Sequence, residues 1–292
     1  MRKLFICLAL VALCVVSVKA DTLQTADSFA VLAGSTVTNA AYPTLINGNV
    51  GVSPGSAVTG FPPGIVLGGT ILTGSNAIVE GAKIDLTNAF TTEAGLSSTG
   101  GITGGLLTGL TLGPGVYTVP AAVSNLAGTL FLSDGGVAGS VFVFQMSSTL
   151  ITSPDSKIDV SGLSPSDSLF WVVGSSATLG DNTAFEGNIL ALTDITFDPG
   201  ATDLCGRALA QDGQVTFAGM NPTSLIQNQV SIGCGGTVGA GGGGLNGGSG
   251  GGTGGGGTSV PEPGTLSLLA LGFSGIAFLR SKGRRAGNRK MA

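Results

Sequence analysis

The chain has 292 residues, of which 52 are glycine, none is histidine, and only 10% are charged. The lack of histidine excludes imidazole metal sites, Ser-His-Asp triads and histidine general bases. Residues 21–232 carry only three basic residues against 15 acidic ones, and such an acidic body cannot follow a phosphate backbone, so we predict no nucleic-acid binding.

Residues 1–20 have the three parts of a secretory signal peptide. Arg2 and Lys3 form a positive start, residues 4–18 are apolar, and small residues at Val18 and Ala20 offer a cleavage site before Asp21. We therefore expect residues 1–20 to be a signal peptide and the protein to be exported.

Two cysteines remain after removal of this segment. Cys7 and Cys14 leave with the signal peptide, while Cys205 and Cys234 stay. An oxidising compartment favours a Cys205–Cys234 disulfide, and two free thiols are the alternative. The sequence leaves both states open.

Residues 21–232 contain many short apolar runs separated by Gly, Ser, Thr, Asn, Asp and Pro. The runs at 141–144, 169–173 and 189–192 have strand length and are rich in β-branched or aromatic residues. Trp171 lies inside one run and is predicted to be core. Arg207, the only arginine of this region, is predicted to pair with a carboxylate on a neighbouring coil.

One stretch, at about residues 75–96, has helical rather than strand periodicity. Its apolar residues recur every three or four positions, while charged residues are predicted to face elsewhere. We predict an amphipathic helix that packs along the strands. The apolar set is Ile78, Ala82, Leu86, Ala89, Phe90 and Ala94, and the charged set is Glu80, Lys83, Asp85 and Glu93.

The later part of this region repeats about every 20 residues. Thr178, Thr196 and Thr216 are separated by 18 and 20 residues, and Gly187 and Gly206 by 19. A repeat of this length with several short strands predicts a β-solenoid, in which coils stack because none can bury its apolar face alone.

Seven motifs follow one another over residues 25–231, at residues 29–39, 46–55, 112–117, 141–145, 170–180, 186–191 and 206–210. Together they closely resemble the microbial ice-binding-like β-solenoid family. The family fold implied is mainly β: a discontinuous three-faced β-solenoid with one long α-helix alongside, the predicted signal and C-terminal hydrophobic helix lying outside it.

This resemblance implies adsorption to ice through a flat solenoid face bearing Thr and Ser. Its methyl and hydroxyl groups would order water without any catalytic group or cofactor. Threonine is also a preferred strand residue, which is the alternative explanation for each position. The residues implied as ice contacts are Thr36, Thr38, Thr59, Ser156, Thr183 and Thr202.

Four aspartates depart from the pattern that the resemblance implies. They place carboxylates in or beside the expected ice-facing turns, which argues for a weakened face. They are also turn formers, and a Ca²⁺ site from Asp181, Asp198 and Asp203 is a lesser alternative; we predict no metal site. The four are Asp155, Asp181, Asp198 and Asp203.

The C-terminal part divides into a linker and a sorting signal. Residues 233–258 hold 17 glycines in 26 positions and are predicted to be a flexible linker. The motif Val260-Pro261-Glu262-Pro263 precedes the apolar segment 264–279, which falls just short of the usual spanning length. The segment 260–285 resembles the PEP-CTERM signal, which implies an exosortase partner; residues 286–292 form a basic tail.

Two functions follow from these observations. The first is an exported ice-binding protein (antifreeze or ice-recrystallisation-inhibiting) whose partner is ice or ordered water. The alternative is a structural or adhesive protein of the extracellular matrix that binds exopolysaccharide. A polysaccharide-cleaving enzyme is disfavoured because few suitable acid and base residues exist, so we predict no catalytic residues. Either product would reach the cell surface or medium after transient membrane anchoring.

Overall fold

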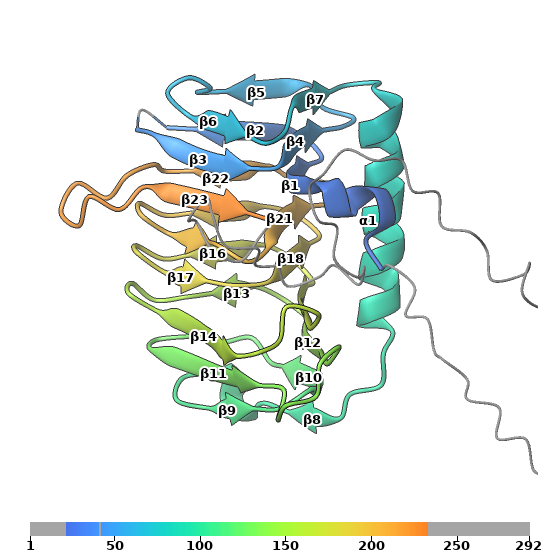
Figure 1. Cartoon of the computed structure of the whole chain (residues 1–292), viewed down its shortest axis with the longest axis vertical. Coiled ribbons are helices and arrows are strands. Elements are labelled where there is room, and N and C mark those ends of the chain that lie inside the picture. The colour runs from blue at the N-terminus through green and yellow to red at the C-terminus, as the bar shows by residue number, and fades with distance from the viewer. Residues whose placement is uncertain (1–21, 41, 233–292) are drawn as a thin grey trace, which may run out of the picture. The chain divides into compact units, whose positions relative to one another are not determined.

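The computed structural model describes residues 22–40 and 42–232, which form three parallel β-sheets wound into a solenoid with one long helix alongside (Figure 1). Neighbouring coils pair in parallel throughout. The predicted fold, a mainly β solenoid with a flanking helix, is confirmed. The predicted signal peptide 1–20, the linker 233–258, the sorting segment 260–285 and the basic tail 286–292 lie outside the described residues.

The three faces are called sheets A, B and C, and the strands of each follow in spatial order. Sheet A holds β7 (Ile71–Thr73), β4 (Asn49–Val52), β1 (Phe29–Ala33), β21 (Arg207–Ala210), β18 (Asn188–Ala191), β15 (Ser168–Val173), β12 (Val141–Met146), β10 (Gly115–Val119) and β8 (Gly100–Gly101). Sheet B holds β13 (Leu150–Ile151), β16 (Ala177–Leu179), β19 (Ile195–Phe197), β22 (Val215–Phe217), β2 (Thr36–Asn39) and β5 (Ala57–Thr59). Sheet C holds β6 (Ile65–Leu67), β3 (Thr44–Asn47), β23 (Asn228–Ser231), β20 (Thr202–Asp203), β17 (Ala184–Phe185), β14 (Lys157–Gly162), β11 (Thr129–Ser133) and β9 (Thr111–Leu112).

The solenoid is discontinuous in sequence. Strands β1, β2 and β3, near the N-terminus, pair with β21, β22 and β23 from the end of the domain. The N-terminal coils therefore continue the stack from the last C-terminal coil, as the resemblance implied.

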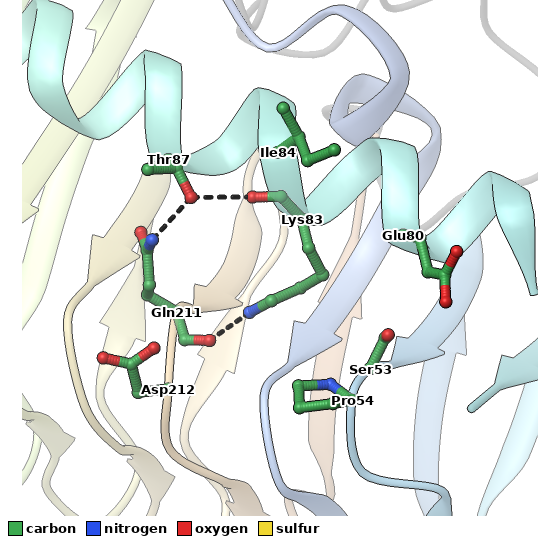
Figure 2. A pocket seen from close by; sticks show the side chains of 8 residues that line it. All are labelled: Ser53, Pro54, Glu80, Lys83, Ile84, Thr87, Gln211 and Asp212. Atoms are coloured by element: carbon green, nitrogen blue, oxygen red, sulfur yellow. Dashed lines mark hydrogen bonds between the residues drawn. The ribbon is translucent and has the colours of Figure 1, made fainter. Parts of the chain in front are cut away.

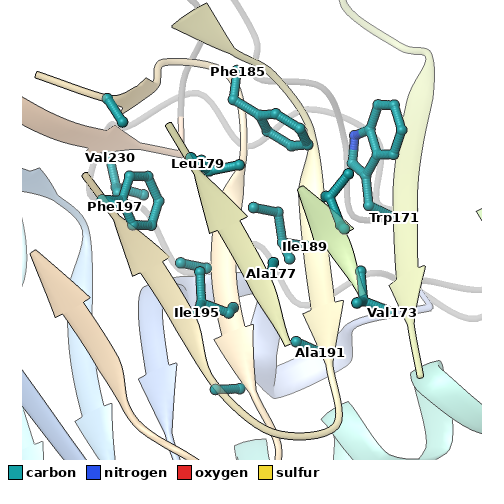
Figure 3. Close-up of a cluster of buried hydrophobic side chains, with 14 of the residues drawn as sticks. Trp171, Val173, Ala177, Leu179, Phe185, Ile189, Ala191, Ile195, Phe197 and Val230 are labelled. Carbon is teal, nitrogen blue, oxygen red and sulfur yellow. The ribbon is translucent and has the colours of Figure 1, made fainter. Parts of the chain in front are cut away.

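Side chains that alternate between the inner and outer faces of the strands form the interior. In β16, β19 and β22 the outer two residues are buried while the central threonine is half-buried, as expected for side chains that alternate between the two faces of a strand. The inward side chains of the three sheets form one apolar core (Figure 3). Trp171 is fully buried there and stacks on Phe144 at a centroid distance of 4.2 Å, so its predicted core position is confirmed.

The helix α1 (Ala77–Ala94) runs along sheet A. Asn76 caps its start by accepting a hydrogen bond from the Ile78 amide. Two short 3-10 helices, η1 (Gln24–Ser28) and η2 (Thr103–Gly105), complete the fold. A second apolar cluster joins α1, η1 and the outer side of sheet A.

Ala82, Leu86 and Ala89 of α1 are buried as predicted, but the buried face differs from the predicted one near both ends of the helix. Val79 is buried, whereas Ile78 is 54% exposed. Glu93, predicted to face away, is buried, and Lys83 is also largely covered. The periodicity located the helix, but it could not choose between the adjacent apolar residues Ile78 and Val79, because the choice depends on how the helix is rotated against sheet A.

Lys83 fixes α1 to the corner between sheets A and B (Figure 2). Its ammonium donates hydrogen bonds to the carbonyls of Ala210, at 2.7 Å, and Gln211. Burial lowers the pKa of Lys83 to about 8, with Asp212 acting in the opposite direction. A basic residue that the pattern placed on the outside therefore caps two backbone carbonyls of the solenoid.

Within residues 22–40 and 42–232, no helix combines the length and apolar character needed to cross a membrane. The predicted apolar segment 264–279 lies outside these residues.

Candidate functional site

The outer face of sheet B carries an unbroken row of threonines. The backbone register pairs each member with the next, across five adjacent strands. Neighbouring strands of a sheet lie about 4.7–4.9 Å apart, so hydroxyl and methyl groups repeat at that interval along the stack. The row, called the threonine row below, is Thr178, Thr196, Thr216, Thr38 and Thr59.

The side chains beneath the threonine row hold it in place. The residues that flank Thr196 and Thr216 within their strands are fully buried. Phe197 and Phe217 lie in contact behind the row, with ring centroids 4.9 Å apart. Because protein interiors are close-packed, this support restricts motion of the face. The row is bounded at one end by Ile151, which pairs with Thr178.

A second set of polar groups borders the row on the side of the A–B corner. The Ser176 hydroxyl lies 3.4 Å from the Asp194 amide, and the Asp194 carboxylate accepts a hydrogen bond from the Gln214 amide at 2.9 Å. The Thr36 hydroxyl lies 3.4 Å from the Gln214 side-chain oxygen. Asp194 is thus bonded to backbone at the edge of the face, and no carboxylate belongs to the threonine row.

Three of the six residues predicted as ice contacts lie on this face. Thr36 and Thr38 are half-buried on β2, and Thr59 is exposed on β5. Thr202 is half-buried on β20, on the outer side of sheet C. The structure thus brings Thr36, Thr38 and Thr59 together and places Thr202 on a different face.

The other two predicted contacts are interior, which corrects their assignment to the surface. Thr183 is fully buried, and its hydroxyl lies 2.8 Å from the Thr152 hydroxyl. Ser156 is 1% exposed and donates to the carbonyls of Leu126 and Ser153. Both lie at the B–C corner, where both hydroxyls donate to the backbone carbonyl of Ser153.

The four aspartates do not intrude on the threonine row. Asp155 and Asp181 lie in turns at the B–C corner, and Asp198 directly follows β19. Burial, reinforced by the Asp181 carboxylate, raises the pKa of Asp198. Asp203 points into the core. Across the described part of the chain, no three acidic or thiol side chains gather as a metal site would require.

Thr178, Thr196 and Thr216 were missed as face residues, although their spacing indicated a repeat. Each is the centre of a triplet with two apolar neighbours, in β16, β19 and β22. Such a triplet in a three-residue strand places the central side chain outward. Aligning these triplets with Val37-Thr38-Asn39 predicts the row, whereas the expected ice-facing turns place the contacts at the corners between sheets.

Arg207 forms the predicted ion pair, but with a residue just before β1. Its guanidinium lies 2.8 Å from the Asp27 carboxylate and also donates to the Asn188 side chain. Cys205 is disulfide-bonded. Cys234, its predicted partner, lies outside the described residues.

Comparison with known proteins relates both the body and the tail of the chain to described families. Residues 31–222 match the family described as ice-binding-like, and residues 259–285 match the PEP-CTERM protein-sorting motif. The chain is 46% identical over 221 residues to an ice-binding protein of Nostoc sp. (strain HG1), covering 74% of this chain and 80% of that one. It is 31% identical over 199 residues to one of Colwellia sp, covering 64% and 77%.

Solved structures show the same architecture. A crystal structure of an ice-binding protein from an Antarctic biological consortium aligns with a TM-score of 0.62 at 40% identity, over 72% of this chain and 89% of that one. The ice-binding protein of the Antarctic ascomycete Antarctomyces psychrotrophicus aligns with a TM-score of 0.61 at 35% identity, over 72% and 97%.

Proposed function

Because this chain belongs to the ice-binding-like family, we propose that it is an exported ice-binding protein and that sheet B is the face that adsorbs to ice. The observation that carries this proposal is the in-register threonine row on five adjacent strands. The relatives described as ice-binding proteins, which match most of the domain, support it.

The chemistry of the row suits adsorption to a crystal of water. Each threonine offers a methyl group and a hydroxyl that both donates and accepts hydrogen bonds. Strand pairing fixes the spacing of these groups, so little conformational entropy is lost when water orders over them. An ionised side chain in the row would hold its own hydration shell, and the row contains none. Thr36 adds a further hydroxyl beside Thr38, and no cofactor or catalytic group is involved.

The first experiment measures thermal hysteresis and inhibition of ice recrystallisation by the purified protein. We expect the protein to inhibit recrystallisation at micromolar concentration and to change the shape of growing ice crystals. An unrelated acidic protein of similar size serves as the control. Recrystallisation equal to that of the control would contradict the proposal and would favour the alternative of a matrix protein that binds exopolysaccharide.

The match to the sorting motif supports a further proposal about the C-terminus. An exosortase would recognise Val260-Pro261-Glu262-Pro263 during export and remove the apolar segment behind it. We expect the intact mass of the protein isolated from its host to correspond to a chain that begins near Asp21 and ends near Pro263. A mass that includes residue 292 would contradict processing.

A further inference from the structure

The interior of sheet C contains one acidic residue in an otherwise apolar column. Asp203 is fully buried and points inward from β20. In register with it, β17 places Phe185 on one side and β23 places Val230 on the other. The column then continues to Ile46 and Val66. A carboxyl group inside such a column contradicts the pattern of the other coils, and violations of this kind mark functional or strained positions.

A second acidic residue lies at the same corner, one coil away. Glu186 follows β17 directly, as Leu204 follows β20, and it is half-buried. Both oxygens of Asp203 and one oxygen of Glu186 are buried without a hydrogen-bond partner. Backbone groups of Gly187 and Cys205 act to lower the pKa of Asp203, and that of Cys205 acts to lower the pKa of Glu186, but burial outweighs them at both residues.

The charged groups around this pair do not neutralise it. Arg207, on β21, acts to lower the pKa of Asp203, but burial and the Glu186 charge act more strongly in the opposite direction. Its guanidinium also contacts Asp27 and Asn188. Lys157, on β14, acts weakly on Glu186 from the outer side of sheet C. The neighbouring Cys205 is in a disulfide and does not titrate.

We propose that Glu186 and Asp203 form a buried proton-binding pair that makes the stacking of these two coils sensitive to pH. In the protonated state the corner is neutral and each carboxyl group can act as a donor as well as an acceptor. Loss of protons places like charges one coil apart in an apolar environment, which favours opening of the corner.

The direction of the effect follows from proton linkage. Burial raises the pKa of Glu186 to about 7, and burial together with the Glu186 charge raises that of Asp203 well above its usual range. The unfolded chain has ordinary carboxyl pKa values near 4. Between the unfolded and folded pKa values, the unfolded chain binds fewer protons than the folded one. The stability that these two protonated carboxyl groups contribute is therefore complete below about pH 4 and declines as the pH rises toward 7.

The test measures chemical unfolding of the full-length protein at pH 5 and pH 8. For the wild type we expect the folding equilibrium constant to fall by about tenfold or more between these pH values, since one unit of pKa shift corresponds to a factor of ten. Asp203→Asn and Glu186→Gln should each reduce that fall and unfold at higher denaturant concentration than the wild type at pH 8. Glu80→Gln, which alters an exposed acid on α1, should retain the wild-type fall.

Hydrogen exchange locates the effect. The amides of Gly206 and Arg207 donate to Ser231 and Gly187 across the stacked corner. After correction for intrinsic exchange, their protection in the wild type should decrease from pH 5 to pH 8, and in Glu186→Gln it should change less. An equal loss of stability in wild type and both carboxyl variants, or unchanged protection of these amides, would overturn the proposal. Neither measurement involves ice, so the outcome is independent of the proposed function.

Discussion

Replacing Thr196 by tyrosine is expected to reduce thermal hysteresis by about tenfold or more while leaving the fold intact. Thr196 lies within the threonine row, between Thr178 and Thr216. A tyrosine ring there stands above both neighbours and holds them away from a planar ice surface. The substitution therefore weakens adsorption by separating several contacts from the ice surface at once.

The matched control is Thr202→Tyr. Thr202 is also half-buried and outward on a short strand, but it belongs to sheet C. Both variants should show wild-type unfolding midpoints, since outward substitutions away from packed groups usually change stability by less than about 0.5 kcal/mol. Equal activity in the wild type and Thr196→Tyr would remove sheet B from the proposal, and loss of activity only in Thr202→Tyr would assign adsorption to sheet C.

The contrast between Thr38 and Thr183 shows what the sequence could predict about this face. Both are threonines in short polar segments, and both were predicted as contacts. Strand alternation alone would separate them, because Thr38 is flanked by the buried residues Val37 and Asn39 of β2, whereas Thr183 lies in a turn. The direction of a side chain in a turn depends on how the backbone bends at the corner, and the periodicity of the sequence does not predict that bend.

The coil repeat and the helix were predictable for a different reason. They depend on apolar periodicity, which each segment carries by itself. The pairing of β1 with β21 depends on the whole stack, since two segments far apart in sequence become neighbours; only the family resemblance predicted it. Asp203 was wrongly placed near the face because aspartate normally prefers turns and exposed positions.

Replacing Trp171 by alanine is expected to give a large loss of stability, about 3–5 kcal/mol, the usual range for deleting a large buried aromatic side chain. The indole is fully buried, stacks on Phe144 and lies 5.1 Å from the Phe185 ring. Its Nε1 donates to the Glu186 carbonyl at 2.9 Å. The substitution therefore opens a cavity between stacked coils and also leaves a carbonyl without its donor.

Thermal unfolding followed by circular dichroism measures this effect, with Trp171→Phe as the control. Phenylalanine keeps most of the stacking but loses the hydrogen bond, so its cost should be about 1–2 kcal/mol. A cost for alanine no larger than that for phenylalanine would show that the neighbouring rings close the cavity. Because Trp171 lies on sheet A and not beneath the threonine row, the alanine variant should retain ice activity at 0 °C while it remains folded. Thr196→Tyr should instead keep wild-type stability and lose ice activity. Comparing Trp171→Ala with Thr196→Tyr would therefore separate the contribution of the threonine row from the stability of the solenoid.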